Sequence, residues 1–144
     1  MQLFVYGTLM DAEIMSHVAG GHFVSRSAKL EGYRRRRVRG EVYPAIVPCP
    51  DETVSGRVYF SLSPAALERL DQFEGQQYER CPVTVTCAAG SLPVQAYILA
   101  PAYHDRLSSE TWELTTFQRS GKVLFSRHYT GFERVRDRRL TGGS

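Results

Sequence analysis

The sequence predicts a single α+β domain in which short strands outnumber helices. With 144 residues, the chain is long enough for one domain with a buried core. Apolar residues make up 42% of the chain and aromatic residues 11%, a composition that argues against intrinsic disorder. Strand-like segments recur along the chain, whereas only a few segments carry apolar residues at helical spacing.

The chain begins with a predicted strand that ends at a glycine and leads into a helix. Residues 2–6 are rich in β-branched and aromatic side chains, and Gly7 allows the backbone to bend sharply. Residues 11–18 then carry apolar side chains at helical spacing. Backbone N–H groups at the start of a helix lack helical partners, so they attract a carboxylate or a phosphate. The joint is therefore either an anion site or an ordinary connection.

Extended segments dominate the chain between residues 22 and 60. We expect strands over residues 22–30, from Gly32 through a run of arginines, over residues 43–47 and over residues 54–60. Residues 48–52 contain two prolines and two acidic residues, a composition that predicts a turn.

Four consecutive arginines follow Tyr33. In an extended chain Arg35, Arg37 and Arg39 share one face, and we expect that face to be solvated. Arg34 and Arg36 share the other face. They either stand at a cavity mouth and attract an acidic ligand, or belong to an edge strand that its charges protect from further pairing.

The clearest helix signal lies between Ser63 and Gly75. Ser63 is a good N-cap, Pro64 suits the first helical position, and Gly75 is a C-terminal stop. The residues expected to form the buried stripe of this helix are Leu67, Leu70 and Phe73.

Glu74 occupies the last turn of this helix, where the negative end of the helix dipole opposes its charge. Such a position costs some tenths of a kcal/mol and tends to raise a carboxyl pKa. A carboxylate placed against local preference beside a glycine is a candidate functional residue. A frayed and solvated helix end is the alternative.

A hairpin and a C-terminal helical segment complete the predicted fold. Residues 78–87 form one strand, residues 88–91 turn, and residues 93–99 return. Tyr97 and Tyr103 either pack in the core or present a hydroxyl to a cavity.

Apolar residues near the C-terminus recur at helical spacing, which predicts a helix or helix pair that covers an open side of the sheet, with Gly121 as a candidate break. The residues in this pattern are Leu114, Phe117, Leu124, Phe125, His128 and Phe132. We expect the domain to span residues 1–132, and the arginine-rich residues 133–144 to form a loosely held tail.

Several classes of function find no support in the sequence. The four histidines lack metal-binding spacing, and no nucleophile elbow or phosphate-binding glycine loop is present. Three cysteines, without a C-x-x-C pair, provide neither a disulfide framework nor a zinc signature. No segment is apolar for long enough to cross a membrane, and no signal peptide opens the chain. We therefore expect a cytoplasmic protein without metal or cofactor.

Two motifs carry a resemblance to a known family. The segment Val5-Tyr6-Gly7-Thr8-Leu9, and Leu70-Asp71-Gln72-Phe73-Glu74-Gly75 followed by Tyr78-Glu79-Arg80, resemble the hallmark motifs of the γ-glutamylcyclotransferase-like superfamily. The chain is most similar to the AIG2-like and γ-glutamylamine cyclotransferase branch of this superfamily. Two further segments, Tyr43-Pro44-Ala45 and Val54-Ser55-Gly56, also resemble that branch. The resemblance covers residues 1–130 and implies a small mixed-sheet β-barrel flanked by helices.

The resemblance also implies roles for individual residues. Tyr6, Gly7, Thr8 and Leu9 match the substrate-binding loop of the family, and Glu74 matches its catalytic acid/base. The family cleaves a γ-glutamyl amide by attack of the substrate's own α-amino group on its γ-carbonyl, which yields 5-oxoproline and a free amine. Glu74 would accept the ammonium proton and return it to the departing amine. The candidates for oxyanion stabilisation are a backbone N–H, Tyr78 and Tyr103.

Two other classes of function are compatible with parts of the sequence. A non-catalytic relative would bind a γ-glutamyl metabolite or a partner protein in the same pocket, but such a protein would not need the glutamate. A nucleic-acid surface would use residues 34–37 and 134–139. The net charge of only +3 and the lack of aromatics within the second cluster argue against it. We therefore expect a small-molecule partner, neither nucleic acid nor membrane. The sequence specifies neither the leaving amine nor the oligomeric state.

Overall fold

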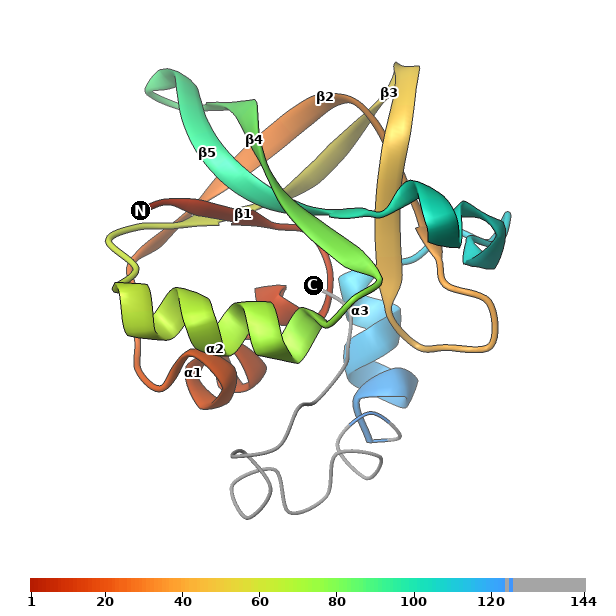
Figure 1. Cartoon of the computed structure of the whole chain (residues 1–144), viewed down its shortest axis with the longest axis horizontal. Helices are drawn as coiled ribbons and strands as arrows, with labels where there is room; N and C mark the ends of the chain where they lie inside the picture. Colours follow the sequence, from red (N-terminus) through yellow and green to blue (C-terminus); the bar gives the residue numbers. More distant parts are fainter. Residues whose placement is uncertain (124, 126–144) are drawn as a thin grey trace.

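The computed structural model describes residues 1–123 and 125, and it shows a closed β-barrel with α1 and α2 packed beneath it (Figure 1). The strand order around the barrel is β1-β3-β2-β4-β5. The strands are β1 (Leu3–Val5), β2 (Ser25–Arg37), β3 (Pro44–Tyr59), β4 (Tyr78–Cys87) and β5 (Gly90–Leu99). The helical elements are η1 (Thr8–Met10), α1 (Ala12–Ala19), α2 (Pro64–Glu74), η2 (Pro101–Arg106), α3 (Leu114–Thr116) and the π-helical turn η3 (Phe117–Gly121).

The short strand β1 closes the barrel. It pairs with β3 in antiparallel orientation, with Leu3 opposite Tyr59, and with β5 in parallel orientation, with Leu3 opposite Gln95. The other strand pairs are antiparallel. The predicted α+β class with a mixed-sheet barrel is therefore confirmed.

Strands β2 and β3 are longer than predicted. The predicted break before Gly32 is a bulge in one continuous strand, since Gly32 adopts φ +84° and the register shifts between Glu31 and Tyr33. The turn predicted at residues 48–52 is wrong, because β3 runs through it. Residues 49–52 of β3 lie opposite the Gly32 bulge, and over this part β3 has a partner strand on one side only. Such edge positions tolerate prolines, which cannot donate to a ladder.

Side chains on the two faces of the sheet form separate clusters. Phe4 and Tyr6 point into the barrel, whereas Leu3 and Val5 face the helices, as the alternation of a strand requires. A Cβ at Gly56 would overlap the carbonyl of Val5 and the ring of Phe4, so β3 passes β1 closely only because this residue is glycine.

The two helices beneath the barrel form as their sequences predict. The Ser63 hydroxyl accepts a hydrogen bond from the Ala66 N–H at 3.1 Å, and α2 ends at Gly75, which has φ +77°. The predicted stripe of Leu67, Leu70 and Phe73 is buried. Predicted strand β4 has the observed bounds, while β5 begins earlier than predicted, at Gly90, because a tighter turn connects the two strands.

The C-terminal segment is helical, but it does not cover an open sheet, because the barrel is closed. Phe117 and Phe125 instead join the cluster that faces the helices. Gly121 does not break the helical segment. A Cβ there would lie 3.0 Å from Phe117 and 3.3 Å from Val42, so close packing requires glycine. The predicted contributions of Leu124, His128 and Phe132, and the predicted boundary after residue 132, lie outside the described residues.

Within the described part of the chain, no helix has the length and apolar character needed to cross a membrane.

Candidate active site

The predicted binding loop leaves the barrel at the end of β1. Tyr6 is fully buried, and its hydroxyl donates to the Tyr97 carbonyl oxygen at 2.7 Å. After Gly7 the chain forms the 3₁₀ turn η1, whose first internal hydrogen bond runs from the Met10 N–H to the Gly7 carbonyl at 2.9 Å. Thr8 and Leu9 are buried within this turn. The four motif residues therefore belong to one tightly folded segment.

Asp11, at the end of this segment, is a buried carboxylate that the sequence reasoning missed. Its side chain is 4% exposed and caps α1 by accepting from the N–H groups of Glu13 and Ile14. Lys122 lies 2.9 Å from the carboxylate, and the Gln118 amide donates to it at 3.1 Å. Burial alone would raise the pKa of Asp11, but these hydrogen bonds outweigh it and lower the pKa. An acidic residue directly before an amphipathic helix was the available signal for the cap.

Glu74 is also buried, with 1% of its surface exposed at the last residue of α2. The alternative of a solvated helix end is therefore wrong. The negative charge of Glu74 affects the pKa values of two tyrosines. Burial raises the pKa of Tyr97, and the negative charge of Glu74 raises it further. The pKa of Tyr43 is raised by burial and also, with smaller weight, by Glu41 and Glu74. Glu74 thus lies in a poorly hydrated site among aromatic side chains.

Tyr97 connects the binding loop with α2. Its main-chain oxygen accepts the Tyr6 hydroxyl, while its own hydroxyl donates to Asp71 in α2 at 2.7 Å. Asp71 is further held by Arg80 at 2.9 Å. Tyr97 therefore contacts Tyr6 through its main chain and α2 through its hydroxyl, and the charge of Glu74 acts on its pKa.

The charge of Glu74 acts on Tyr43, and neither Tyr43 nor its partner Gln77 was predicted as a site residue. The Gln77 amide hydrogen-bonds to the Tyr43 side chain. The Gln77 Oε1 atom is buried and accepts no hydrogen bond from the described part of the chain. Tyr43 is the first residue of the Tyr43-Pro44-Ala45 segment that resembles the family, and this resemblance could have identified it. Nothing in the sequence around Gln77 predicts a role for it.

The two tyrosines predicted to assist the reaction have different surroundings. Tyr78 is buried, and its hydroxyl donates a hydrogen bond to the Pro44 carbonyl at 2.9 Å. This hydrogen bond holds the start of β3. Tyr103 lies in η2, partly buried against the helix-facing cluster, with the Arg106 guanidinium 5.2 Å from its ring centre. The described contacts of Tyr103 do not connect it to Glu74.

The face predicted to be solvated in the arginine run is not solvated at Arg35. The Arg35 Nη1 donates to the carbonyls of Tyr6 at 2.8 Å and Ser55 at 2.9 Å. Arg34 is exposed, and Arg36 pairs with Glu52 at 3.0 Å. The alternation was interpreted without the strand order, in which β1 and β2 both pair with β3.

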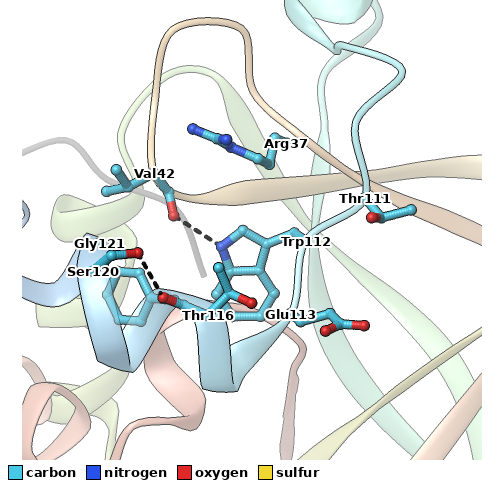
Figure 2. Close-up of a pocket in the computed structure, with 9 residues that line it drawn as sticks. Arg37, Val42, Thr111, Trp112, Glu113, Thr116, Ser120 and Gly121 are labelled. Carbon is cyan, nitrogen blue, oxygen red and sulfur yellow. Dashed lines mark hydrogen bonds between the residues drawn. The ribbon is translucent and has the colours of Figure 1, made fainter.

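A pocket of about 310 Å³ lies beside the C-terminal helical segment, and Figure 2 shows its lining. Its polar side chains include Arg37, Glu113 and Ser120. The Trp112 indole lines it as well and donates to the Val42 carbonyl at 2.8 Å. None of the predicted site residues lines this pocket.

Acid/base chemistry on a bound small molecule is the reaction type that this arrangement suits best. Glu74 is a buried carboxylate whose charge acts on Tyr43 and Tyr97, and a glycine-containing loop follows β1. Among residues 1–123 and 125, no group of three or more His, Cys, Asp or Glu side chains is arranged to hold a metal ion.

Comparisons with known proteins identify the family and the fold. A family described as "Gamma-glutamyl cyclotransferase, AIG2-like" matches residues 3–114. The chain is 33% identical to AIG2-like protein D of Arabidopsis thaliana over 118 residues, which cover 77% of this chain and 78% of that protein. It spans only 48–57% of the length of three further curated AIG2-like proteins of the same plant.

Solved structures show the same fold. The solution structure of At5g39720.1 from Arabidopsis thaliana superposes with a TM-score of 0.67 at 27% identity, over 96% of this chain and 94% of that chain. A structure titled "Gamma-glutamyl cyclotransferase" superposes with a TM-score of 0.61 at 18% identity, over 71% of this chain and 72% of that chain. The chain therefore belongs to the AIG2-like gamma-glutamyl cyclotransferase family.

Proposed function

We propose that the protein cleaves a γ-glutamyl amide or γ-glutamylamine into 5-oxoproline and a free amine. The α-amino nitrogen of the substrate forms a bond to the γ-carbonyl carbon, and the bond from that carbon to the leaving nitrogen breaks. One α-ammonium proton moves to Glu74 before the attack, and a second leaves the same nitrogen as the lactam forms. The departing nitrogen takes up two protons, one of them from Glu74, and leaves as an ammonium ion, so the carboxylate is regenerated. Because the nucleophile belongs to the substrate, the protein must chiefly hold the substrate folded and transfer a proton.

The burial of Glu74 is the observation that carries this proposal. An ionisable side chain is rarely this deeply buried, and at the C-terminal end of a helix the local dipole disfavours its negative charge. Such placements are typical of residues whose proton affinity serves a reaction. The charge of Glu74 acts on Tyr43 and Tyr97, and burial makes a carboxylate a stronger base than it is in water.

The Tyr6–Leu9 loop supplies the complementary half of the proposed site. Gly7 has no side chain, so the substrate α-carboxylate can approach the main-chain N–H groups of residues 7–9. A carboxylate bound there leaves the α-ammonium group and the γ-carbonyl for the region of Glu74. The three free cysteines (Cys49, Cys81 and Cys87) fit the reducing, cytoplasmic setting proposed for this enzyme.

The experiment is a panel of γ-glutamylamines, γ-glutamyl dipeptides and glutathione, with 5-oxoproline and the released amine measured for each. We expect stoichiometric release of 5-oxoproline and one amine from at least one class. Glu68→Gln provides the matched control for any Glu74 variant, because Glu68 is an exposed glutamate of the same helix.

A wild-type protein that releases 5-oxoproline from none of these compounds would contradict the proposal. If it nevertheless bound 5-oxoproline or a γ-glutamyl amine, the non-catalytic binding relative would be the better description.

A further inference from the structure

Arg35 donates hydrogen bonds to the main chain where the candidate binding loop leaves the barrel. The last pair of the β1–β3 ladder is Val5 with Arg57. Just beyond that pair, the Arg35 Nη1 bridges the carbonyls of Tyr6 and Ser55 at 2.8 and 2.9 Å. One charged donor thus holds β1 and β3 together at the point where their own ladder ends.

Trp112 holds Arg35 in this position. The guanidinium carbon lies 5.4 Å from the indole ring centre, within the range of a cation–π contact. Trp112 is buried, packs on Phe117 with ring centres 5.8 Å apart, and donates its indole N–H to the Val42 carbonyl (Figure 2). Val42 directly precedes Tyr43, which lies beside Glu74. The Arg35–Trp112 pair therefore contacts the main chain at Tyr6, in the candidate loop, and at Val42, next to Tyr43.

We propose that Arg35, held by Trp112, is the positioning residue of the loop that receives the substrate carboxylate. The proposal rests on the proposed function for the identity of that ligand. In a trans peptide the N–H points opposite to the preceding carbonyl. By fixing the Tyr6 carbonyl, Arg35 fixes the direction of the Gly7 N–H. Its positive charge also favours an anion at the loop.

The chemistry of this contact requires arginine. A guanidinium is planar and always charged, and it can accept a stacked aromatic ring while its N–H groups hold two carbonyls. A lysine at this position would keep the charge but would lose the stacking and the fixed direction of the donor. Among the described residues, the carboxylate whose charge acts on Arg35 is that of Glu113, which is exposed.

The test compares Arg35→Met with Arg34→Met, which removes an equal charge from an exposed neighbour on the same strand. The probe is 5-oxoproline, which carries the carboxylate common to all γ-glutamyl substrates and contains no leaving amine. We expect Arg35→Met to weaken 5-oxoproline binding on the order of tenfold, the worth of one hydrogen bond to a charged group. KM should rise by a similar factor with kcat little changed, because the loop that Arg35 positions holds the carboxylate in the substrate and in the transition state alike. Arg34→Met should leave both quantities unchanged.

A second readout does not depend on activity. Amide hydrogen exchange at residues 7–9 of the unliganded protein should accelerate in Arg35→Met and in Trp112→Leu, and it should remain at the wild-type rate in Arg34→Met. Arg35→Lys should fall between wild type and Arg35→Met, and thermal melts confirm that the compared proteins are folded. Unchanged exchange at residues 7–9 in folded Arg35→Met would overturn the positioning role. Accelerated exchange without any 5-oxoproline binding in the wild type would instead overturn the proposed ligand.

Discussion

Two acidic side chains are buried in the described part of the chain, and they stand at opposite kinds of helix end. Asp11 caps the N-terminus of α1, where backbone N–H groups, Gln118 and Lys122 all favour its negative charge. Glu74 ends α2, where the helix dipole disfavours the same charge. Asp11 therefore stabilises the fold, whereas we propose that Glu74 is buried for the proton transfer of the proposed reaction.

The largest difference between these two carboxylates is expected in turnover. Glu74→Gln keeps the size of the side chain and removes its basicity, so 5-oxoproline release should fall by about 10²–10⁴, the usual worth of a positioned acid/base. Asp11→Asn should lower the turnover of the folded protein far less. Initial rates at equal concentrations of folded protein measure both, with Glu68→Gln as the control. A near-wild-type rate in Glu74→Gln means that another residue transfers the proton.

For folding stability, the larger effect is expected at Asp11. Asp11→Ala removes the cap of α1 and the partner of Lys122, so the free energy of unfolding should fall by about 2–3 kcal/mol. Asp11→Asn retains a good cap and should lose less. Urea denaturation of both variants beside the wild type measures the two contributions. Equal stability of Asp11→Ala and the wild type would show that the buried network around Asp11 does not support the fold.

Asp11 also makes a prediction about pH. Its pKa is lower in the folded protein than the ordinary value of 3.8, so the folded state favours the carboxylate form. The resulting stability is fully present above that value and is lost as the pH falls through the lower, folded pKa. The stability difference between wild type and Asp11→Asn should therefore be constant near neutral pH and should shrink below about pH 4. A difference that persists unchanged at pH 2–3 would contradict this assignment.

The smallest expected effect is at the cysteines. Burial raises the pKa of the Cys81 thiol, so this thiol is a poor nucleophile at neutral pH. Cys81→Ser, or a chelator added to the wild type, should leave 5-oxoproline release unchanged. Loss of activity in either case, at unchanged melting temperature, would point to chemistry that does not run through Glu74.

Features set by local sequence were predicted well. The Ser63 cap, Pro64 and Gly75 define α2 through contacts within a few residues, so its bounds followed directly. The periodicity of β4 is equally local. The two family motifs identified the superfamily because each keeps its residue order within a short segment.

Features set by barrel closure were not predicted. Arg35 was expected in solvent because nothing in its strand indicates that the Tyr6 carbonyl lies within reach. The contact of Gln77 with Tyr43, and the effect of Glu74 on Tyr43, likewise depend on how the start of β3 and the end of α2 lie in the fold, and not on their own sequences. Residues 48–52 were assigned to a turn since two prolines usually end a strand, whereas the missing partner on one side of β3 lets the strand continue.

The most direct test of the account measures turnover, 5-oxoproline binding and thermal stability of Glu74→Gln on one preparation. The account predicts lost turnover, retained binding, and a melting temperature equal to or slightly above that of the wild type, because the substitution removes a disfavoured charge from a helix C-terminus. A structural role for Glu74 predicts instead that the melting temperature falls together with activity. A lowered melting temperature with turnover per folded molecule unchanged would contradict the assignment of Glu74 as the acid/base.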